Sequence, residues 1–358
     1  MPSSTSNSEY PIADPAPPEK PVPTLRWGVA GMAALVVTLA ALGAWEAYWR
    51  NWGAEPTYRN SEGLWAIQRR RVQPDSTVLV GSSRTLSNIN LNVWEKLDGK
   101  RPIQLALEGT SPVTPLEWLA DDASFKGRVL VGVTPLLFFS GFQYRQDVLD
   151  YYPKETPSQR SGQWLSMKFL EPYLAFYEPD FALFTVLKRQ GWPQRAGVRK
   201  DSDVRRLFVA DADRNMRMWH KMENDVEYQN NQKAIWKEFW DPPDPKMMAA
   251  GPMLRAKQLE RAPAAVKKLR ERGVQVVFVL HPVDGEFGHV EFMVNPRADT
   301  WEVLLNRSGV PGIHFQDYPE LQGYRLPEWS HMTGKEAERY TEALYPLVKA
   351  KWAEQEKR

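Results

Sequence analysis

The chain has 358 residues, with 46 Lys and Arg against 44 Asp and Glu, so its formal net charge is only +2. This balance argues against a nucleic-acid binder that works through bulk charge, because such binders need a basic excess on one face. The sequence has no cysteine, which excludes disulfides, thiolate metal sites and a cysteine nucleophile.

The N-terminal part of the chain predicts a tail followed by a membrane anchor. Residues 1–25 are rich in Ser, Pro and Glu, a composition typical of disorder. Residues 27–45 hold no charge, and aromatic residues flank this run on both sides, as at the two interfaces of a bilayer. We therefore expect one transmembrane helix over residues 26–49. Arg and Lys stand on both sides of it, so charge does not fix its orientation.

The remaining chain predicts an α/β domain over residues 73–358, joined to the anchor by a partly helical stalk over residues 50–72. Apolar, β-rich runs alternate with helical patterns, which favours a parallel sheet covered by helices on both faces. The expected strands are 77–80, 103–107, 128–133, 274–280 and 312–315. The expected helices are 88–97, 115–123, 253–272, 302–307 and 333–352.

An insertion at about residues 140–250 interrupts this alternation and is dense in aromatic residues. Its pattern predicts helical pieces broken at Pro172 and Pro179. Three interpretations stay open for it. It can be a helical subdomain on the sheet edge, a lid over a cleft, or a surface that rests on the membrane or on a membrane partner.

We expect the functional residues directly after the strands, because open parallel sheets place their sites at the carboxyl ends of the strands. The first strand ends in Gly81, Ser82, Ser83 and Arg84. A Ser at such a turn, next to a helix N-terminus, can act as a nucleophile if a base lies nearby. The alternative is that the two Ser residues are only turn and N-cap residues.

Three further blocks carry suitable groups. Gly109 follows the second strand, where a backbone N–H can bind an oxyanion, and Thr134 follows the third. His331 precedes the last helix and stands three residues after Glu328. Such a pair can supply a general base and the carboxylate that orients it.

Together these four blocks resemble the SGNH (GDSL-like) hydrolase superfamily, over residues of roughly 73–140 and 253–350. The resemblance implies a flavodoxin-like parallel sheet, with Ser83 as nucleophile, His331 as base and Glu328 as the acid of the triad. It places Gly109 and the Ser83 N–H in the oxyanion hole, and it leaves Ser82, Arg84 and Thr134 as further binding residues.

The sequence departs from the superfamily pattern at two points. Thr134 stands where the third block usually has Asn, and Glu328 replaces the usual Asp of the last block. Asp317 and Asp284 are alternative acids for His331. His281, at the end of the fourth strand, also lies near the expected site.

The Gly-Ser-Ser version with an N-terminal span looks most like envelope acyl-transfer proteins, such as those of teichoic-acid D-alanylation and alginate O-acetylation. This resemblance implies a single-pass protein of the cytoplasmic membrane with its large domain on the periplasmic or outer side. It implies a Ser-dependent O-acyltransferase or esterase that acts on a cell-envelope glycan or an acyl carrier, beside a membrane-bound O-acyltransferase. The alternative is a non-catalytic accessory subunit that binds an integral membrane partner.

The sequence contains no recognisable motif for metal, dinucleotide or nucleotide-phosphate binding. There is no HExxH or comparable metal spacing, no GxGxxG and no phosphate-binding GxxxxGK[ST] loop. We therefore expect no cofactor, no metal and no nucleic-acid partner.

Overall fold

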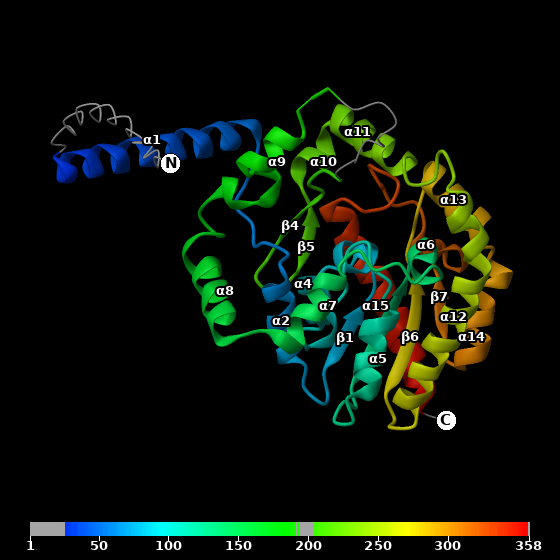
Figure 1. Cartoon of the computed structure of the whole chain (residues 1–358). Coiled ribbons are helices and arrows are strands. Elements are labelled where there is room, and N and C mark those ends of the chain that lie inside the picture. The colour runs from blue at the N-terminus through cyan, green and yellow to red at the C-terminus, as the bar shows by residue number, and fades with distance from the viewer. Residues whose placement is uncertain (1–25, 191, 194–203, 357–358) are drawn as a thin grey trace, which may run out of the picture. The chain divides into compact units, whose positions relative to one another are not determined.

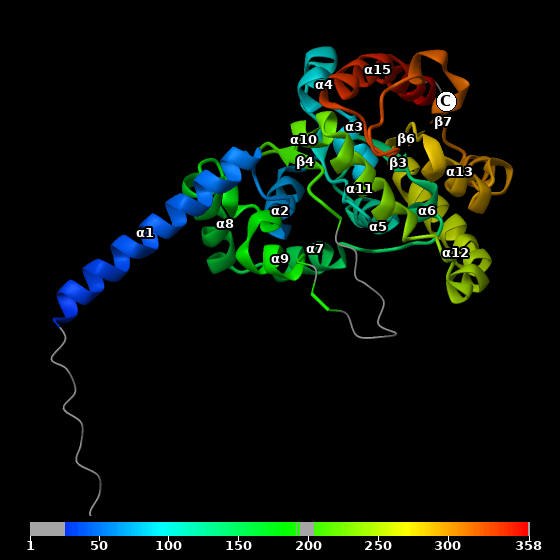
Figure 2. The same ribbon diagram turned by 90° about the horizontal axis from the view of Figure 1, so that it is seen from above.

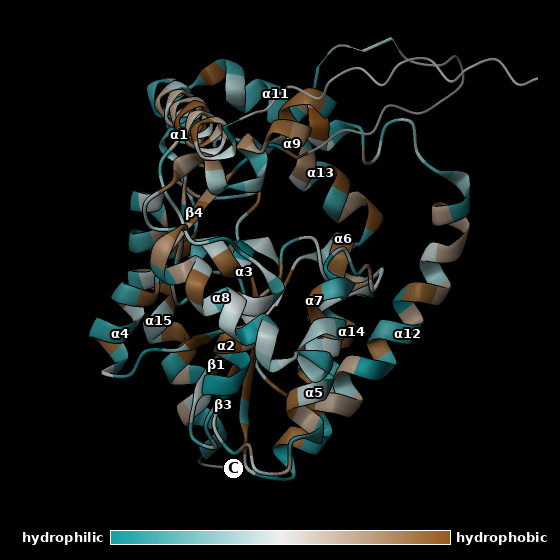
Figure 3. Cartoon of the chain, turned by 60° about the vertical axis from the view of Figure 1, so that its left-hand side comes forward, coloured by the Kyte–Doolittle hydropathy of each residue, from teal (hydrophilic) through white to brown (hydrophobic). Residues whose placement is uncertain are grey.

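A computed structural model describes residues 26–190, 192–193 and 204–356 of the chain, which divides into two compact units at Ala47 and Tyr48. Helix α1 (Trp27–Trp52) begins in the first unit and ends in the second, and it is long and apolar enough to cross a membrane. Most of its apolar side chains are exposed, and Figure 3 colours parts of its ribbon brown, for hydrophobic residues. The expected span at 26–49 is thus a helix, extended by three residues. The expected tail at 1–25 lies outside the described residues.

The second unit is an α/β domain built on a five-stranded parallel sheet (Figure 1). The strand order is β2-β1-β3-β6-β7. The strands are β1 (Thr77–Val80), β2 (Ile103–Gln104), β3 (Arg128–Val133), β6 (Gln275–Leu280) and β7 (Gly312–His314). Nearly every residue of the central strands β1, β3 and β6 is buried, which explains their continuous apolar character in the sequence.

All five expected strands are present, although three are shorter than predicted. Strand β2 ends at Gln104, yet its pairing continues, because the N–H groups of Leu105 and Leu107 donate to the carbonyls of Leu79 and Gly81. These two hydrogen bonds hold the chain after β2 beside the carboxyl end of β1. That edge of the sheet carries the candidate site.

Helices cover both faces of the sheet (Figure 2). One layer holds α5 (Val113–Asp121), α12 (Pro245–Arg270) and α14 (Trp301–Ser308). The other holds α3 (Ser83–Asn88), α4 (Leu91–Asp98) and α15 (Gly334–Glu356). A further helix, α13 (Gly285–Val294), follows β6 and was not predicted.

Two predicted helices differ from the structure for local reasons. The helix expected at 88–97 begins three residues later, as α4, because the Asn90 side chain accepts hydrogen bonds from the N–H groups of Asn92 and Val93 and caps it. Asn88 is the last residue of the separate helix α3. Helix α12 begins eight residues before the expected start, at an Asp244 N-cap, and it continues through Pro252. A proline inside a helix removes one hydrogen bond but did not end this helix.

The segment expected as a stalk is packed into the domain. Helix α2 (Glu62–Arg71) buries Leu64 and Trp65, and the Trp65 indole N–H donates to the Leu105 carbonyl at 3.0 Å. Residues 62–71 therefore belong to the core of the domain.

The described part of the insertion is mostly helical, and it also contains an antiparallel hairpin that the sequence did not predict. The hairpin consists of β4 (Phe208–Ala210) and β5 (Met216–Met218). The helices are α7 (Gln146–Tyr151), α8 (Pro157–Phe169), α9 (Leu183–Lys188), α10 (His220–Asn224) and α11 (Val226–Lys237). The predicted breaks at Pro172 and Pro179 are present, and short 3₁₀ turns fill the gap between α8 and α9.

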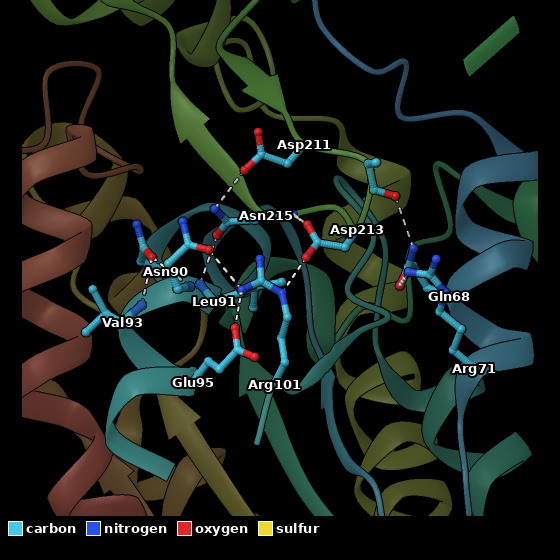
Figure 4. A network of polar contacts seen from close by, with 12 residues as sticks. Gln68, Arg71, Asn90, Leu91, Val93, Glu95, Arg101, Asp211, Asp213 and Asn215 are labelled. Atoms are coloured by element: carbon cyan, nitrogen blue, oxygen red, sulfur yellow. Dashed lines mark hydrogen bonds and ion pairs between the residues drawn. The ribbon is translucent and has the colours of Figure 1, made fainter. Parts of the chain in front are cut away.

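A polar network fixes the hairpin to the core (Figure 4). The Asn215 side chain accepts from the Leu91 N–H at 2.9 Å, and Asp213 forms an ion pair with Arg101. The Gln68 amide donates to the Ala212 carbonyl at 3.2 Å. The hairpin is therefore held at a fixed position against α2 and α4, and this position brings Phe208 to the candidate site.

Candidate active site

The first element of the site is the turn after β1. Ser83 is the first residue of α3 and is half-buried, whereas Ser82 is fully buried. A β-carbon at Gly81 would lie 2.0 Å from Thr85 Oγ1, so only glycine fits this turn. As the first helical residue, Ser83 has a backbone N–H without an acceptor inside the helix. Both its hydroxyl and its N–H are thus available at the carboxyl end of β1.

Ser83, His331 and Glu328 form a continuous hydrogen-bonded relay. Ser83 Oγ lies 2.8 Å from His331 Nε2, and His331 Nδ1 lies 3.0 Å from Glu328 Oε1. When the neutral His331 ring carries its proton on Nδ1, this N–H donates a hydrogen bond to the Glu328 carboxylate. Nε2 is then free of a proton and can accept a hydrogen bond from the Ser83 hydroxyl. This is the geometry of a nucleophile, a general base and an orienting acid.

Glu328 is fully buried but is held ionised by its donors. Burial alone would raise the pKa of its carboxyl. The charge of a protonated His331 and hydrogen bonds from His331 and Trp236 outweigh burial and keep this pKa below its usual range. The two alternative acids lie elsewhere: Asp317 is paired with Arg297, and Asp284 caps α13.

The insertion supplies two aromatic residues to the relay. The indole N–H of Trp236, on α11, donates to Glu328 Oε2 at 2.6 Å. The ring of Phe208, on β4, meets the His331 ring edge-on with centroids 5.0 Å apart. Sequence reasoning missed both residues. The only signal was the aromatic density of the insertion, which does not single out an indole as the partner of a carboxylate 92 residues away.

Gly109 lies in the loop after β2, which runs beside the Ser83 turn through the hydrogen bond from Leu107 N–H to the Gly81 carbonyl. Its φ is +60°, a left-handed conformation that favours glycine. A β-carbon there would lie 2.9 Å from Tyr144 Cβ. The residue therefore needs both the conformational freedom and the small size of glycine.

Thr134 and Ser82 contact each other directly. Their hydroxyl groups share a hydrogen bond of 2.5 Å, and both residues are buried. The bond joins the end of β3 to the Ser83 turn, so all the predicted blocks meet at one edge of the sheet. The Thr134 hydroxyl is engaged with Ser82 at the position where the superfamily pattern has Asn.

Arg84 lies beneath the relay. Its side chain is fully buried and is paired with the buried Glu291 at 2.6 Å. Its Nε also donates to Ser330 Oγ at 3.0 Å, next to His331 in the chain. The structure thus places Arg84 where it connects the Ser83 helix to the His331 loop, with its guanidinium shielded from solvent.

His281 belongs to a separate buried chain of hydrogen bonds. Its Nε2 lies 3.1 Å from Thr85 Oγ1 and its Nδ1 lies 2.9 Å from the Tyr340 hydroxyl. Burial, assisted by the Arg84 charge, lowers the pKa of His281 to about 3, so the ring is neutral. It supports the Ser83 helix through Thr85 and does not join the relay.

Among the residues that the structure describes, no group of three or more His, Asp or Glu is placed to hold a metal ion. Comparisons of the sequence with protein-family models and with curated proteins gave no match. What the site can do must therefore be argued from its own geometry.

Proposed function

We propose that the protein is a membrane-anchored, Ser-dependent acyltransferase or esterase of the SGNH type. The observation that carries this proposal is the Ser83–His331–Glu328 relay, with successive distances of 2.8 and 3.0 Å. A hydrogen-bonded Ser and His that are only structural have no need of a third, ionised residue aligned behind the His.

The sheet supports the same proposal. Strands β4 and β5 belong to the separate hairpin, so the sheet strands taken in chain order are arranged 2-1-3-4-5. This is the strand order of flavodoxin-like doubly wound folds. The relay lies at the carboxyl ends of the strands, where such sheets bind ligands.

The proposed reaction has two half-steps. His331 Nε2 takes the proton of Ser83 Oγ as the oxygen bonds to the acyl carbon of an ester. The N–H groups of Ser83 and Gly109 donate to the oxyanion. The ester C–O bond then breaks, and His331 returns the proton to the departing alcohol. In the second half-step His331 takes the proton of a glycan hydroxyl or water as that oxygen bonds to the acyl carbon. The bond between the acyl carbon and Ser83 Oγ then breaks, and His331 returns the proton to Ser83 Oγ.

A serine-directed fluorophosphonate tests the proposal on the full chain in lipid vesicles. We expect labelling of the wild type and none of Ser83→Ala, whereas Ser124→Ala, a change in an exposed loop, should label normally. Ester turnover should fall by about four to six orders of magnitude in Ser83→Ala. Unchanged labelling of Ser83→Ala would rule out Ser83 as the nucleophile.

One observation favours the alternative of a non-catalytic accessory subunit. The Thr134 hydroxyl is bonded to Ser82, so the oxyanion site lacks the third donor that an Asn would give. A subunit of this kind would co-purify with an integral membrane partner, and Ser83→Ala and His331→Ala would leave its cellular function intact. Ester turnover that depends on both residues would exclude it.

For the cellular setting, we place α1 across the cytoplasmic membrane and the domain on its outer side, beside a membrane-bound O-acyltransferase and an envelope glycan. The length and apolar character of α1 support the span. The outer location follows the SGNH resemblance and is tested by labelling an engineered cysteine in the domain with an impermeant reagent in intact cells.

A further inference from the structure

Helices α8 and α9 have an unusual pattern of exposure. Neither helix buries a residue of its own. A surface helix of a soluble domain normally turns an apolar stripe to the core. Here large apolar side chains face outward, and they define what we call the α8–α9 face: Trp164, Leu165, Phe169, Leu183, Phe184 and Leu187. Figure 3 shows α9 mostly in brown.

This face is attached to the place where the domain begins after the apolar span. The Phe181 ring stacks on the Trp49 ring at 4.8 Å, and the Arg50 guanidinium donates to the Tyr173 carbonyl at 2.7 Å. Trp49 and Arg50 already belong to the second unit, and they follow the end of the charge-free run at Trp45 by about 6–8 Å of helix. Tyr173 follows α8 and Phe181 precedes α9. The C-terminal end of α8 and the N-terminal end of α9 are therefore both held close to Trp49 and Arg50.

The charged residues on α8 and α9 are all basic: Arg160, Lys168 and Lys188. Lys168 and Lys188 are exposed, and Lys168 Nζ lies over the rings of Trp164 and Phe169 at 4.7 and 5.3 Å. Of the three acidic residues between the two helices, Glu171 is buried, Glu178 is half-buried and Asp180 is paired with Arg189. Apolar and aromatic side chains with exposed Lys fit the interfacial region of an anionic bilayer.

We propose that the α8–α9 face inserts into the headgroup region of the bilayer that α1 spans, with anionic lipid as its ligand. The inference rests on the membrane anchor of the proposed function but not on the Ser83 chemistry. The domain is then attached to the membrane at two places, the span and the face. This second contact prevents the domain from turning freely about residue 48.

The absence of cysteine allows a clean test. Full chains with Phe184→Cys or Leu165→Cys, carrying a nitroxide, are reconstituted singly into vesicles of phosphatidylcholine and phosphatidylglycerol. Leu97→Cys is the matched control, since Leu97 is 41% exposed against 48% for Leu165 and lies on α4. We expect collisions with a water-soluble nickel relaxant to fall at least about threefold at both sites relative to Leu97, and collisions with oxygen to rise.

Further measurements distinguish failure of the anchor proposal from failure of the α8–α9 face proposal. A nitroxide at Val36→Cys reports on the span itself: if it is accessible to nickel, the anchor proposal fails. If Val36 is protected while Phe184 and Leu165 behave like Leu97, the anchor stands and the α8–α9 face proposal is overturned. Protection that disappears on dilution with lipid would identify a second copy as the occupant and would also overturn it. Equal protection in pure phosphatidylcholine would refute the preference for anionic lipid.

Discussion

Trp236→Phe tests how the insertion supports the relay. The substitution keeps an aromatic ring beside His331 and Phe287 but removes the N–H that reaches Glu328 Oε2 at 2.6 Å. Glu328 Oε1 has three donors, from the Ser330 backbone and from the backbone and ring of His331. The indole is the donor that the structure gives to Oε2, so the carboxylate loses its support on that side.

The size of the effect follows from the kind of hydrogen bond that is lost. A hydrogen bond to a charged group contributes about 1.5–3 kcal/mol, which corresponds to about 10- to 150-fold in rate if the ionised relay is needed in the transition state. The hydrogen bond from Trp236 is one of the causes that lower the pKa of Glu328, so this pKa rises when the indole is removed. The rise moves the acid limb of the pH–rate profile to higher pH.

The assay is kcat/KM for a chromogenic ester across the pH range, with Trp240→Phe as the control. Trp240 also packs on Phe287, with ring centroids 5.1 Å apart, but its indole N–H makes no hydrogen bond within the described residues. We expect Trp240→Phe to keep the wild-type profile. The reasoning is refuted if Trp236→Phe, with an unchanged unfolding midpoint, keeps kcat/KM within about twofold and leaves the acid limb in place.

Three other substitutions probe the surroundings of the relay. The pKa of His281 is lowered from 6.5 to about 3, so its contribution to the free energy of unfolding is complete above pH 6.5 and is lost at about 1.4 kcal/mol per unit as pH falls towards 3. Chemical denaturation should show a flatter pH dependence for His281→Gln, and parallel curves would contradict this. Arg84→Met leaves Glu291 buried without its partner and should cost about 3–5 kcal/mol, part of which Arg84→Met with Glu291→Leu recovers. A cost below about 1 kcal/mol for the single change would exclude a strong pair. Gly109→Ala should lower both the unfolding midpoint and ester turnover, because it adds a steric contact to a backbone strain of about 1–2 kcal/mol. Gly99→Ala is the control, since φ there is +75° and no atom lies within 4 Å of the added β-carbon. Its unfolding midpoint should fall through backbone strain alone.

The sheet could be predicted from the sequence because its central strands are buried on both sides. Residues 78–80, 129–133 and 276–280 form continuous runs without a polar side chain, and a parallel strand with two covered faces has no polar side to interrupt the pattern. The same alternation located the strand ends, and the candidate residues at those ends do lie together in the structure.

The contribution of the insertion could not be predicted. Strands β4 and β5 have three residues each, too few for a period-2 pattern to stand out. The bond between Trp236 and Glu328 joins two segments whose local sequence does not point to each other, since it depends on where α11 docks. Long-range side-chain contacts of this kind follow from packing and not from local propensity.

The docking of α11 makes the integrity of the Ser83–His331–Glu328 relay depend on local stability. A partial opening that lifts α11 and β4 from the sheet would take Trp236 and Phe208 away from the relay while β1, β3 and β6 remain folded. Such sub-global opening requires less free energy than unfolding of the core. On gradual denaturation, turnover should therefore disappear before the core of the domain melts.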